Sequence, residues 1–251
     1  IMTYTLKNQE NYENMGLEVF LYEHDKTKAR GVYVKSDDKN KTFAIGFKTP
    51  PTNSKGMAHI MEHSVLNGSD KYNTREPFMD MASSSLQTFL NAMTFLDKTV
   101  YPVSSENDKD FYNLTDVYLD AVFNPTIRHK KEILLQEGWH YVLDGDKVSG
   151  ISGVVYNEMK GALSDPDQLI YDDVVSHLYK NSPYEYESGG DPSEIYKLTY
   201  EEFLDFYKDH YHPSNSYIYF YGDLDIDFYL EHLDKNYPVS YTHLTLPTNR
   251  E

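Results

Sequence analysis

The sequence contains no cysteine among its 251 residues. This absence excludes disulfide bonds, thiolate metal ligands and cysteine nucleophiles. The sequence also has no apolar run near the roughly 20 residues that a membrane-spanning helix needs, so no membrane partner is expected. Its first residues, Ile-Met-Thr-Tyr-Thr-Leu-Lys, have no basic stretch leading into an apolar one and show no signal peptide. Because an Ile precedes the Met, we do not expect residue 1 to be the native start.

Basic residues are scarce, with 23 Lys and Arg against 40 Asp and Glu, which gives a net charge of −17. This balance argues against a nucleic-acid partner, because phosphates select for Lys and Arg. Excess acid keeps a protein soluble, and it attracts cationic partners where it lines a cleft. With 39% hydrophobic and 25% charged residues, the composition is typical of a globular protein.

The last dozen residues differ in character from the rest. The stretch VSYTHLTLPTN at 239–249 has neither helical nor strand periodicity. Its reverse translation can reproduce the end of a sequencing adapter. We therefore expect one domain over residues 1–238 and a non-native tail over residues 239–251. A genuine unstructured tail is the alternative.

Hydrophobic periodicity predicts the secondary structure of the domain. Alternating residues predict an antiparallel meander of three strands at 16–22, 31–34 and 42–47, and further strands at 88–92, 100–104 and 215–221. Helical spacing predicts helices at 55–66, 77–86, 108–123, 126–136, 153–163, 166–179, 199–211 and 225–233. Because the order lacks regular strand–helix alternation, it predicts an α+β fold with an antiparallel or mixed sheet covered by helices.

The predicted helix at 55–66 carries His59, Glu62 and His63. Histidines at positions i and i+4 lie on one helical face, so both imidazoles can bind one zinc ion. Glu62 stands next to the second histidine, where a carboxylate can take a proton from a zinc-activated water. This is the H-x-x-E-H pattern of inverzincin peptidases. The alternative is a solvated helix that carries these residues by chance.

A third metal ligand must be His, Asp or Glu in a chain without cysteine. Glu158 is the best candidate, because it is a carboxylate in an otherwise apolar helix start, within GVVYNEMKGA. The alternative is an exposed acid near a helix N-terminus, where the helix dipole favours negative charge. Spacing alone does not separate these two interpretations.

Several motifs occur in order along the chain: GMAHIMEHSVLNGSDKY, EPFMDM, SLQTFLNAMTFLDKTVYPV, NDKDFYNLTDVYLDAVFNP, LQEGWHY, GVVYNEMKGALSDP, SGGDPSEI, HYHPSN and YGDL. Together, over about residues 16–224, they resemble the first domain of the pitrilysin/insulinase family of zinc metallopeptidases, in its presequence protease branch. The resemblance implies a metallohydrolase domain like that of mitochondrial processing peptidase. It also implies a metalloendopeptidase that binds one zinc ion (Zn²⁺) per chain and hydrolyses unfolded peptides.

The resemblance also implies roles for individual residues. His59, His63 and Glu158 match the zinc ligands of the family, and Glu62 matches its general base. Glu137, in QEGW, matches an acidic position near the site, although a surface acid at a helix end is equally consistent with the sequence.

Leu90, Asn91 and Ala92 match the edge strand on which family members hold an extended substrate by backbone pairing. An ordinary sheet strand is the alternative. Phe78 and Met79 are expected to pack in the core rather than to line a pocket. His212 is expected to be structural, and Asp191 is expected to cap a helix that begins with Pro192.

Family members of this branch are built from four such domains in two halves that close around a chamber, and this chain holds one domain. Its expected partners are unfolded peptide substrates and the missing C-terminal domains of the same polypeptide. Without those domains the chain can be inactive.

A non-catalytic, peptide-binding subunit of the family is a second hypothesis, although such subunits typically lose the metal motif. S-ribosylhomocysteine lyase, which also uses H-x-x-E-H, is excluded because its third ligand is cysteine. The expected location is cytoplasmic by default, or the mitochondrial matrix or plastid if a targeting segment is missing.

Overall fold

The computed structural model describes residues 3–74 and 77–237, so the predicted tail at 239–251 lies outside the described residues. Its main layer is an eight-stranded mixed sheet in the order β1-β2-β3-β10-β4-β7-β5, with β6 also paired to β7. A separate hairpin is formed by β8 and β9. The strands are β1 Tyr4–Tyr12, β2 Leu17–His24, β3 Arg30–Lys35, β4 Lys41–Lys48, β5 Gln87–Leu90, β6 Met93–Thr94, β7 Lys98–Ser105, β8 His140–Asp144, β9 Lys147–Ser152 and β10 Ser216–Gly222.

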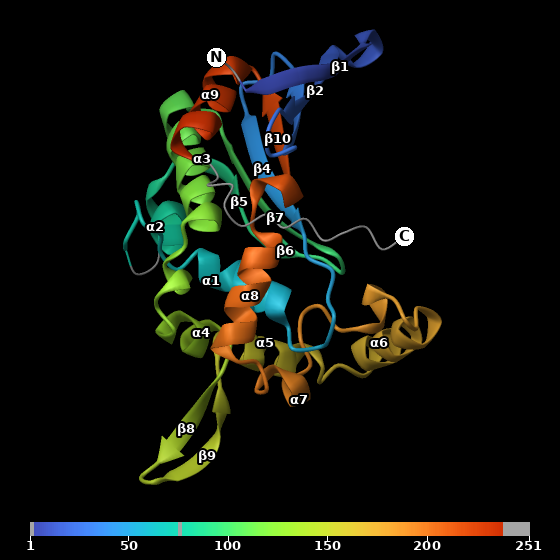
Figure 1. The fold of residues 1–251 in the computed structure, drawn as a ribbon, viewed down its shortest axis with the longest axis vertical. Coiled ribbons are helices and arrows are strands. Elements are labelled where there is room, and N and C mark those ends of the chain that lie inside the picture. Colours follow the sequence, from blue (N-terminus) through green and yellow to red (C-terminus); the bar gives the residue numbers. More distant parts are fainter. Residues whose placement is uncertain (1–2, 75–76, 238–251) are drawn as a thin grey trace.

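Helices cover one side of this sheet, as the α+β prediction requires. In Figure 1, α3 and α9 lie along the sheet, α1 and α8 lie below them, and the β8–β9 hairpin projects from the end that holds α4 and α5. The helices are α1 Met57–Val65, α2 Pro77–Ser84, α3 Asp108–Phe123, α4 Glu132–Glu137, α5 Val154–Ala162, α6 Pro166–Leu178, α7 Pro192–Ile195, α8 Tyr200–His210 and α9 Ile226–Asn236. Within the described residues, no helix is long and apolar enough to span a bilayer.

The predicted antiparallel meander is wrong at its centre, because β10 lies between β3 and β4. It runs parallel to β3 and antiparallel to β4. The loop between β3 and β4 crosses the end of β10, where the Asp223 N–H donates to the Asp38 carbonyl at 2.9 Å. Phe220 of β10 packs against Phe43 of β4, with ring centroids 5.2 Å apart. Alternation identifies a strand, and its neighbours are set by long-range packing of this kind.

Other elements differ from the predictions at local breaks in periodicity. Residues 126–136 form a 3-10 turn, Thr126–Arg128, followed by the short helix α4, rather than one helix. Strand β1 and the β8–β9 hairpin were not predicted, although the Gly145-Asp146 dipeptide between β8 and β9 is a typical two-residue hairpin turn. The cap at Asp191 is confirmed, because its side chain accepts from the Ser193 N–H and Pro192 begins α7.

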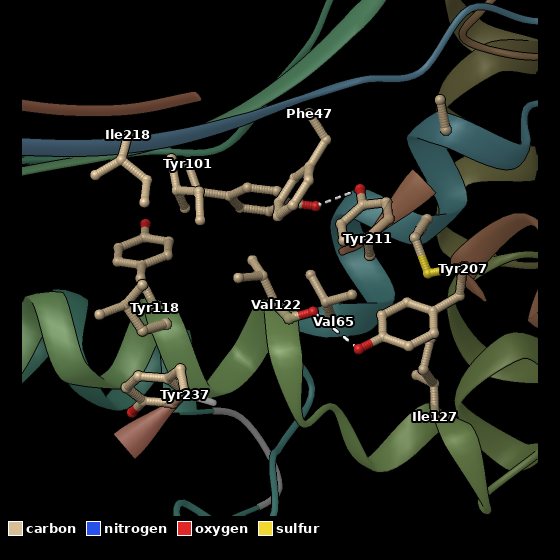
Figure 2. Close-up of a cluster of buried hydrophobic side chains, with 14 of the residues drawn as sticks. Phe47, Val65, Tyr101, Tyr118, Val122, Ile127, Tyr207, Tyr211, Ile218 and Tyr237 are labelled. Carbon is tan, nitrogen blue, oxygen red and sulfur yellow. Dashed lines mark hydrogen bonds between the residues drawn. The ribbon is translucent and has the colours of Figure 1, made fainter. Parts of the chain in front are cut away.

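Aromatic side chains fill much of the core between the sheet and the helices (Figure 2). Phe47 of β4 stacks on Tyr211 with ring centroids 4.6 Å apart. The hydroxyls of Tyr211 and Tyr101 hydrogen-bond to each other at 2.8 Å, and Tyr207 donates to the Val122 carbonyl at 3.0 Å. Each of these three buried tyrosine hydroxyls therefore has a partner, which lets tyrosine serve as a core residue.

A buried carboxylate ties the last described helix to the rest of the domain. Asp116 of α3 accepts from His232 Nε2 at 2.8 Å and from the Tyr237 hydroxyl at 2.7 Å. Lys71 Nζ and the Tyr72 hydroxyl donate to its other oxygen. Burial raises the pKa of Asp116, but these hydrogen bonds outweigh it and hold the pKa well below the ordinary value.

We expect Asp116→Ala to lower the free energy of unfolding by about 3 kcal/mol or more, since it leaves buried donors without a partner. Urea denaturation measures the loss. The matched control, Asp205→Ala on the exposed face of α8, should stay within about 0.5 kcal/mol of the wild type. Because the folded-state pKa is depressed, the difference should be complete above the ordinary pKa of 3.8 and should shrink as the pH falls below it. Equal effects of the two substitutions would contradict this account.

Candidate metal centre

Helix α1 is held in place by a close approach of two backbones. Gly56 precedes the helix with a φ of +68°, and a Cβ at that position would lie 2.8 Å from the Gly189 carbonyl oxygen. Inside the helix, Ile60 and Met61 are fully buried against the core. These two contacts fix the orientation of the helix, so that the face with His59 and His63 lines a cavity.

The structure brings together three of the residues singled out in the sequence. Glu158 Oε2 lies 3.6 Å from His59 Nε2 and 3.7 Å from His63 Nε2. The two imidazole centroids are 5.0 Å apart, as expected one helical turn apart on α1. One donor atom from each of the three residues lies within 4.8 Å of the others, so they form a group that can hold one metal ion.

Each histidine has a separate partner for its other ring nitrogen. His59 Nδ1 lies 3.1 Å from the Gly189 carbonyl oxygen, and His63 Nδ1 lies 3.4 Å from Glu137 Oε2. Partners of this kind orient metal-binding imidazoles and determine which nitrogen carries the proton. Both Nε2 atoms are thereby left facing Glu158. Glu137 is buried and contacts His63, as expected for an acid near the site rather than one on the surface.

The two glutamates come from helices that are joined by the projecting hairpin. Glu137 ends α4 and Glu158 lies in α5, and the backbones meet at the base of the hairpin. A Cβ at Gly153 would lie only 2.1 Å from the Gly138 carbonyl oxygen, so position 153 has no room for a side chain. The Trp139 indole donates to the Leu198 carbonyl at 3.0 Å and attaches this base to the loop before α8.

Glu62 is buried and points toward β6. The Thr94 hydroxyl donates to Glu62 Oε2 at 2.5 Å. Both side chains line a cavity of about 1010 Å³ together with the three residues of the metal-binding group. Other residues on its wall are Leu66, Asn67, Phe78, Met79, Asn91, Ala92, Met93, Phe95, Gln136, Glu137, Val154, Met159, Glu187, Ser188 and Gly189.

The predicted edge strand lies at the border of this cavity. Strand β5 is the last in the sheet order and ends at Leu90, and Asn91 and Ala92 follow it on the cavity wall. The side chain of Leu90 packs against the core instead. The backbone of Asn91 forms hydrogen bonds within the domain. Its N–H donates to the Pro102 carbonyl, and its carbonyl accepts from the Tyr118 hydroxyl.

The structure agrees with the expectations for Phe78 and His212 and differs from the one for Met79. Phe78 packs against the core as expected, and it also lines the cavity. The expectation is wrong for Met79, which is 58% exposed at the cavity wall. His212 contacts Ser214 Oγ and the Asp209 carbonyl, and it lies outside the metal-binding group, in keeping with a structural role.

Carboxylates dominate the electrostatics around the histidines. Burial lowers the pKa of His63, but Glu137, Glu62 and Glu158 raise it by more, so the net pKa is above the ordinary value. Burial also raises the pKa of Glu187, while its hydrogen bond from the Gly189 N–H lowers it and Asp172 raises it further. The sequence did not identify Thr94 or Glu187 as site residues. Thr94 contacts Glu62 from a distant element, and Glu187 bonds the Gly189 N–H in a loop that packs beside His59.

Comparison with known proteins supports one family. Residues 42–189 match the insulinase family (peptidase family M16), and residues 197–237 match the peptidase M16 inactive domain. Protein HypA of Clostridium perfringens is 54% identical over 93% of this chain and 24% of its own length. Presequence protease 1, chloroplastic/mitochondrial, of Arabidopsis thaliana is 49% identical over 83% of this chain and 19% of its own length. The mitochondrial presequence protease of Schizosaccharomyces pombe is 44% identical over 89% of this chain and 23% of its length.

Solved structures agree on the fold. Pitrilysin covers 93% of this chain with a TM-score of 0.68 at 14% identity, and the match is 24% of the pitrilysin chain. A peptidase M16 inactive domain from Pseudomonas fluorescens covers 85% of this chain with a TM-score of 0.67 at 16% identity, and the match is 48% of its own chain. The chain spans about a quarter of the length of the curated relatives it matches. Over most of its length, this chain belongs to the insulinase family of peptidases, peptidase family M16.

Proposed function

We propose that residues 1–238 form the zinc-binding catalytic domain of a metalloendopeptidase that hydrolyses unfolded peptides. The observation that carries this proposal is the convergence of His59 Nε2, His63 Nε2 and Glu158 Oε2 at one point of the cavity wall. Membership of a peptidase family supports the reaction class.

The donor set fits zinc. Two imidazole nitrogens and one carboxylate oxygen are the three protein ligands typical of catalytic zinc sites, in which a further position stays open for water or substrate. Imidazole ligands suit zinc, and the absence of cysteine disfavours metals that prefer thiolate ligands. Bound zinc would supply Lewis acidity, which activates water and polarises a peptide carbonyl.

Glu62 is the residue that we assign to proton transfer. It lies one position before His63, and its carboxylate faces the cavity beside the metal-binding group. A carboxylate there can accept a proton from the attacking water and then deliver it to the leaving amine. The Thr94 hydroxyl holds one carboxylate oxygen, so the other remains available for this transfer.

The substrate class follows from the cavity and its border. An open cavity of about 1010 Å³ beside an edge strand accommodates an extended peptide, which can add to the sheet by backbone hydrogen bonds. Ala92 is the residue that we assign to this backbone contact. We assign Asn91 only to the cavity wall beside the peptide, because its backbone N–H is already bonded to the Pro102 carbonyl. Because the relatives are about four times longer than this chain, we propose further domains of the same polypeptide as its partners in catalysis.

A second candidate is a non-catalytic peptide-binding subunit. It is favoured by the match of residues 197–237 to the peptidase M16 inactive domain and by the similarity to a solved domain of that type. The complete set of His59, Glu62, His63 and Glu158 argues for the catalytic alternative. A chain that binds zinc and peptide without hydrolysing the peptide would favour the second candidate.

We expect Glu158→Gln to weaken zinc binding far more than Glu137→Gln does. The first change replaces a ligand, whereas the second changes a group that orients His63, for which losses of about 10–100-fold are typical. Competition with a chromophoric chelator measures both affinities. Equal losses, or a larger loss in Glu137→Gln, would contradict the assignment of Glu158 as the third ligand.

We expect Glu62→Gln to retain zinc and to lose hydrolysis of an unfolded peptide by roughly 10²–10⁴-fold, the usual contribution of general acid–base catalysis. The measurement compares zinc content and cleavage rate in wild type and variant of the full-length polypeptide, purified identically. A chelator-treated sample of each controls for contaminating proteases. Hydrolysis that persists in the variant at the wild-type rate would eliminate Glu62 as the base.

A further inference from the structure

We propose that Glu187 is a positioning residue that places the proton of His59 on Nδ1 by way of the Gly189 backbone. With the proton on Nδ1, the lone pair of Nε2 faces Glu158 and the metal position. The link to zinc rests on the proposed function. The link to the His59 tautomer does not, because it concerns the metal-free chain.

Two hydrogen bonds of Gly189 connect Glu187 to His59. Glu187 Oε1 accepts from the Gly189 N–H at 2.9 Å. On the other side of the same residue, the Gly189 carbonyl oxygen lies 3.1 Å from His59 Nδ1. A carbonyl oxygen only accepts hydrogen bonds, so this contact requires a proton on Nδ1. The neighbouring His63 differs, because its Nδ1 faces the carboxylate of Glu137 directly.

The loop that holds Glu187 is anchored to the residues before α1. The Glu187 N–H donates to Ser54 Oγ at 3.2 Å, and the Asp191 N–H donates to the Ser54 carbonyl at 2.8 Å. Between these two anchors the chain makes a tight turn, in which the Gly190 N–H donates to the Glu187 carbonyl. The Glu187 side chain holds the peptide plane that includes the Gly189 N–H, and the Glu187 carbonyl holds the next plane, which includes the Gly189 carbonyl and the Gly190 N–H. Glu187 therefore bonds the peptide planes on both sides of Gly189.

The same loop also touches the helix that carries Glu158. A Cβ at Gly189 would lie 2.8 Å from Met159 Cε, so the loop packs directly on α5. It therefore lies between α1 and α5, the carriers of His59 and Glu158. If the Gly189 N–H lost its partner, rotation about the backbone bonds of Gly189 could move the carbonyl away from His59 Nδ1.

A carboxylate suits this position because a charged acceptor makes a stronger hydrogen bond to a backbone N–H than a neutral one. Glu187 is partly buried, and its other close charged neighbours, Asp172 and Asp191, are acids that disfavour its charge. The hydrogen bond from the Gly189 N–H, by contrast, favours the charged side chain. A glutamine can make the same hydrogen bond through its amide oxygen, whereas an alanine cannot.

Nitrogen-15 NMR of the metal-free chain tests the tautomer directly. With labelled histidine at about pH 9, where imidazoles are neutral, we expect His59 of the wild type to carry its proton on Nδ1. In Glu187→Ala we expect a shift toward the Nε2–H form, and in Glu187→Gln we expect the wild-type pattern. A wild-type His59 protonated on Nε2 would overturn the proposal without the need for a variant.

Zinc affinity provides the second readout. We expect Glu187→Ala to bind zinc roughly 10–100-fold more weakly than wild type, and Glu187→Gln to remain close to wild type. Asp225→Ala, which removes the N-cap of the distant helix α9, is the control for a general loss of stability. It should lower the melting temperature and leave zinc affinity unchanged.

The outcomes separate the two proposals. Wild-type chain without zinc binding would refute the proposed function, while the tautomer measurement would still decide the role of Glu187. Zinc binding in wild type with no change of tautomer or affinity in Glu187→Ala would overturn the positioning role and leave the function intact. A loss in Glu187→Gln equal to that in Glu187→Ala would also overturn it, because charge rather than the hydrogen bond would then be responsible.

Discussion

The candidate site depends on two places where backbones meet with no side chain between them. Gly56 lies against Gly189 at the start of α1, and Gly153 lies against Gly138 at the base of the hairpin. The first contact places the histidines under the loop that binds His59, and the second brings the end of α4 next to α5. A side chain at Gly56 or Gly153 would separate the elements that carry the donors, since the clashing atoms are backbone.

The charges at the site are arranged to receive a cation. Glu62, Glu137 and Glu158 surround His63, and together they raise the pKa of His63 against the effect of burial. Glu62 and Glu137 are buried, and burying two carboxylates near one another costs free energy unless a positive charge compensates. A divalent metal between His59, His63 and Glu158 would provide that charge, and it would compete with the proton for the same imidazole nitrogens.

Local signals in the sequence account for part of this arrangement. The i, i+4 spacing was sufficient to place His59 and His63 on one face. Helical spacing predicted the bounds of α3 correctly, and the structure shows that Asn107 caps its start. Glu158 was one of two open interpretations until the family resemblance was considered. The position of β10, the contact between Thr94 and Glu62, and the placement of Gly189 beside His59 could not be predicted, because they depend on packing between segments far apart in the chain.

The central claim is that His59, His63 and Glu158 hold a single zinc ion. The most direct test is the zinc content of the purified chain after reconstitution and removal of free metal, measured beside His59→Ala. The account predicts about one zinc per wild-type chain and a loss of that zinc in the variant. A folded wild-type chain without zinc, or equal zinc content in the two proteins, would contradict it.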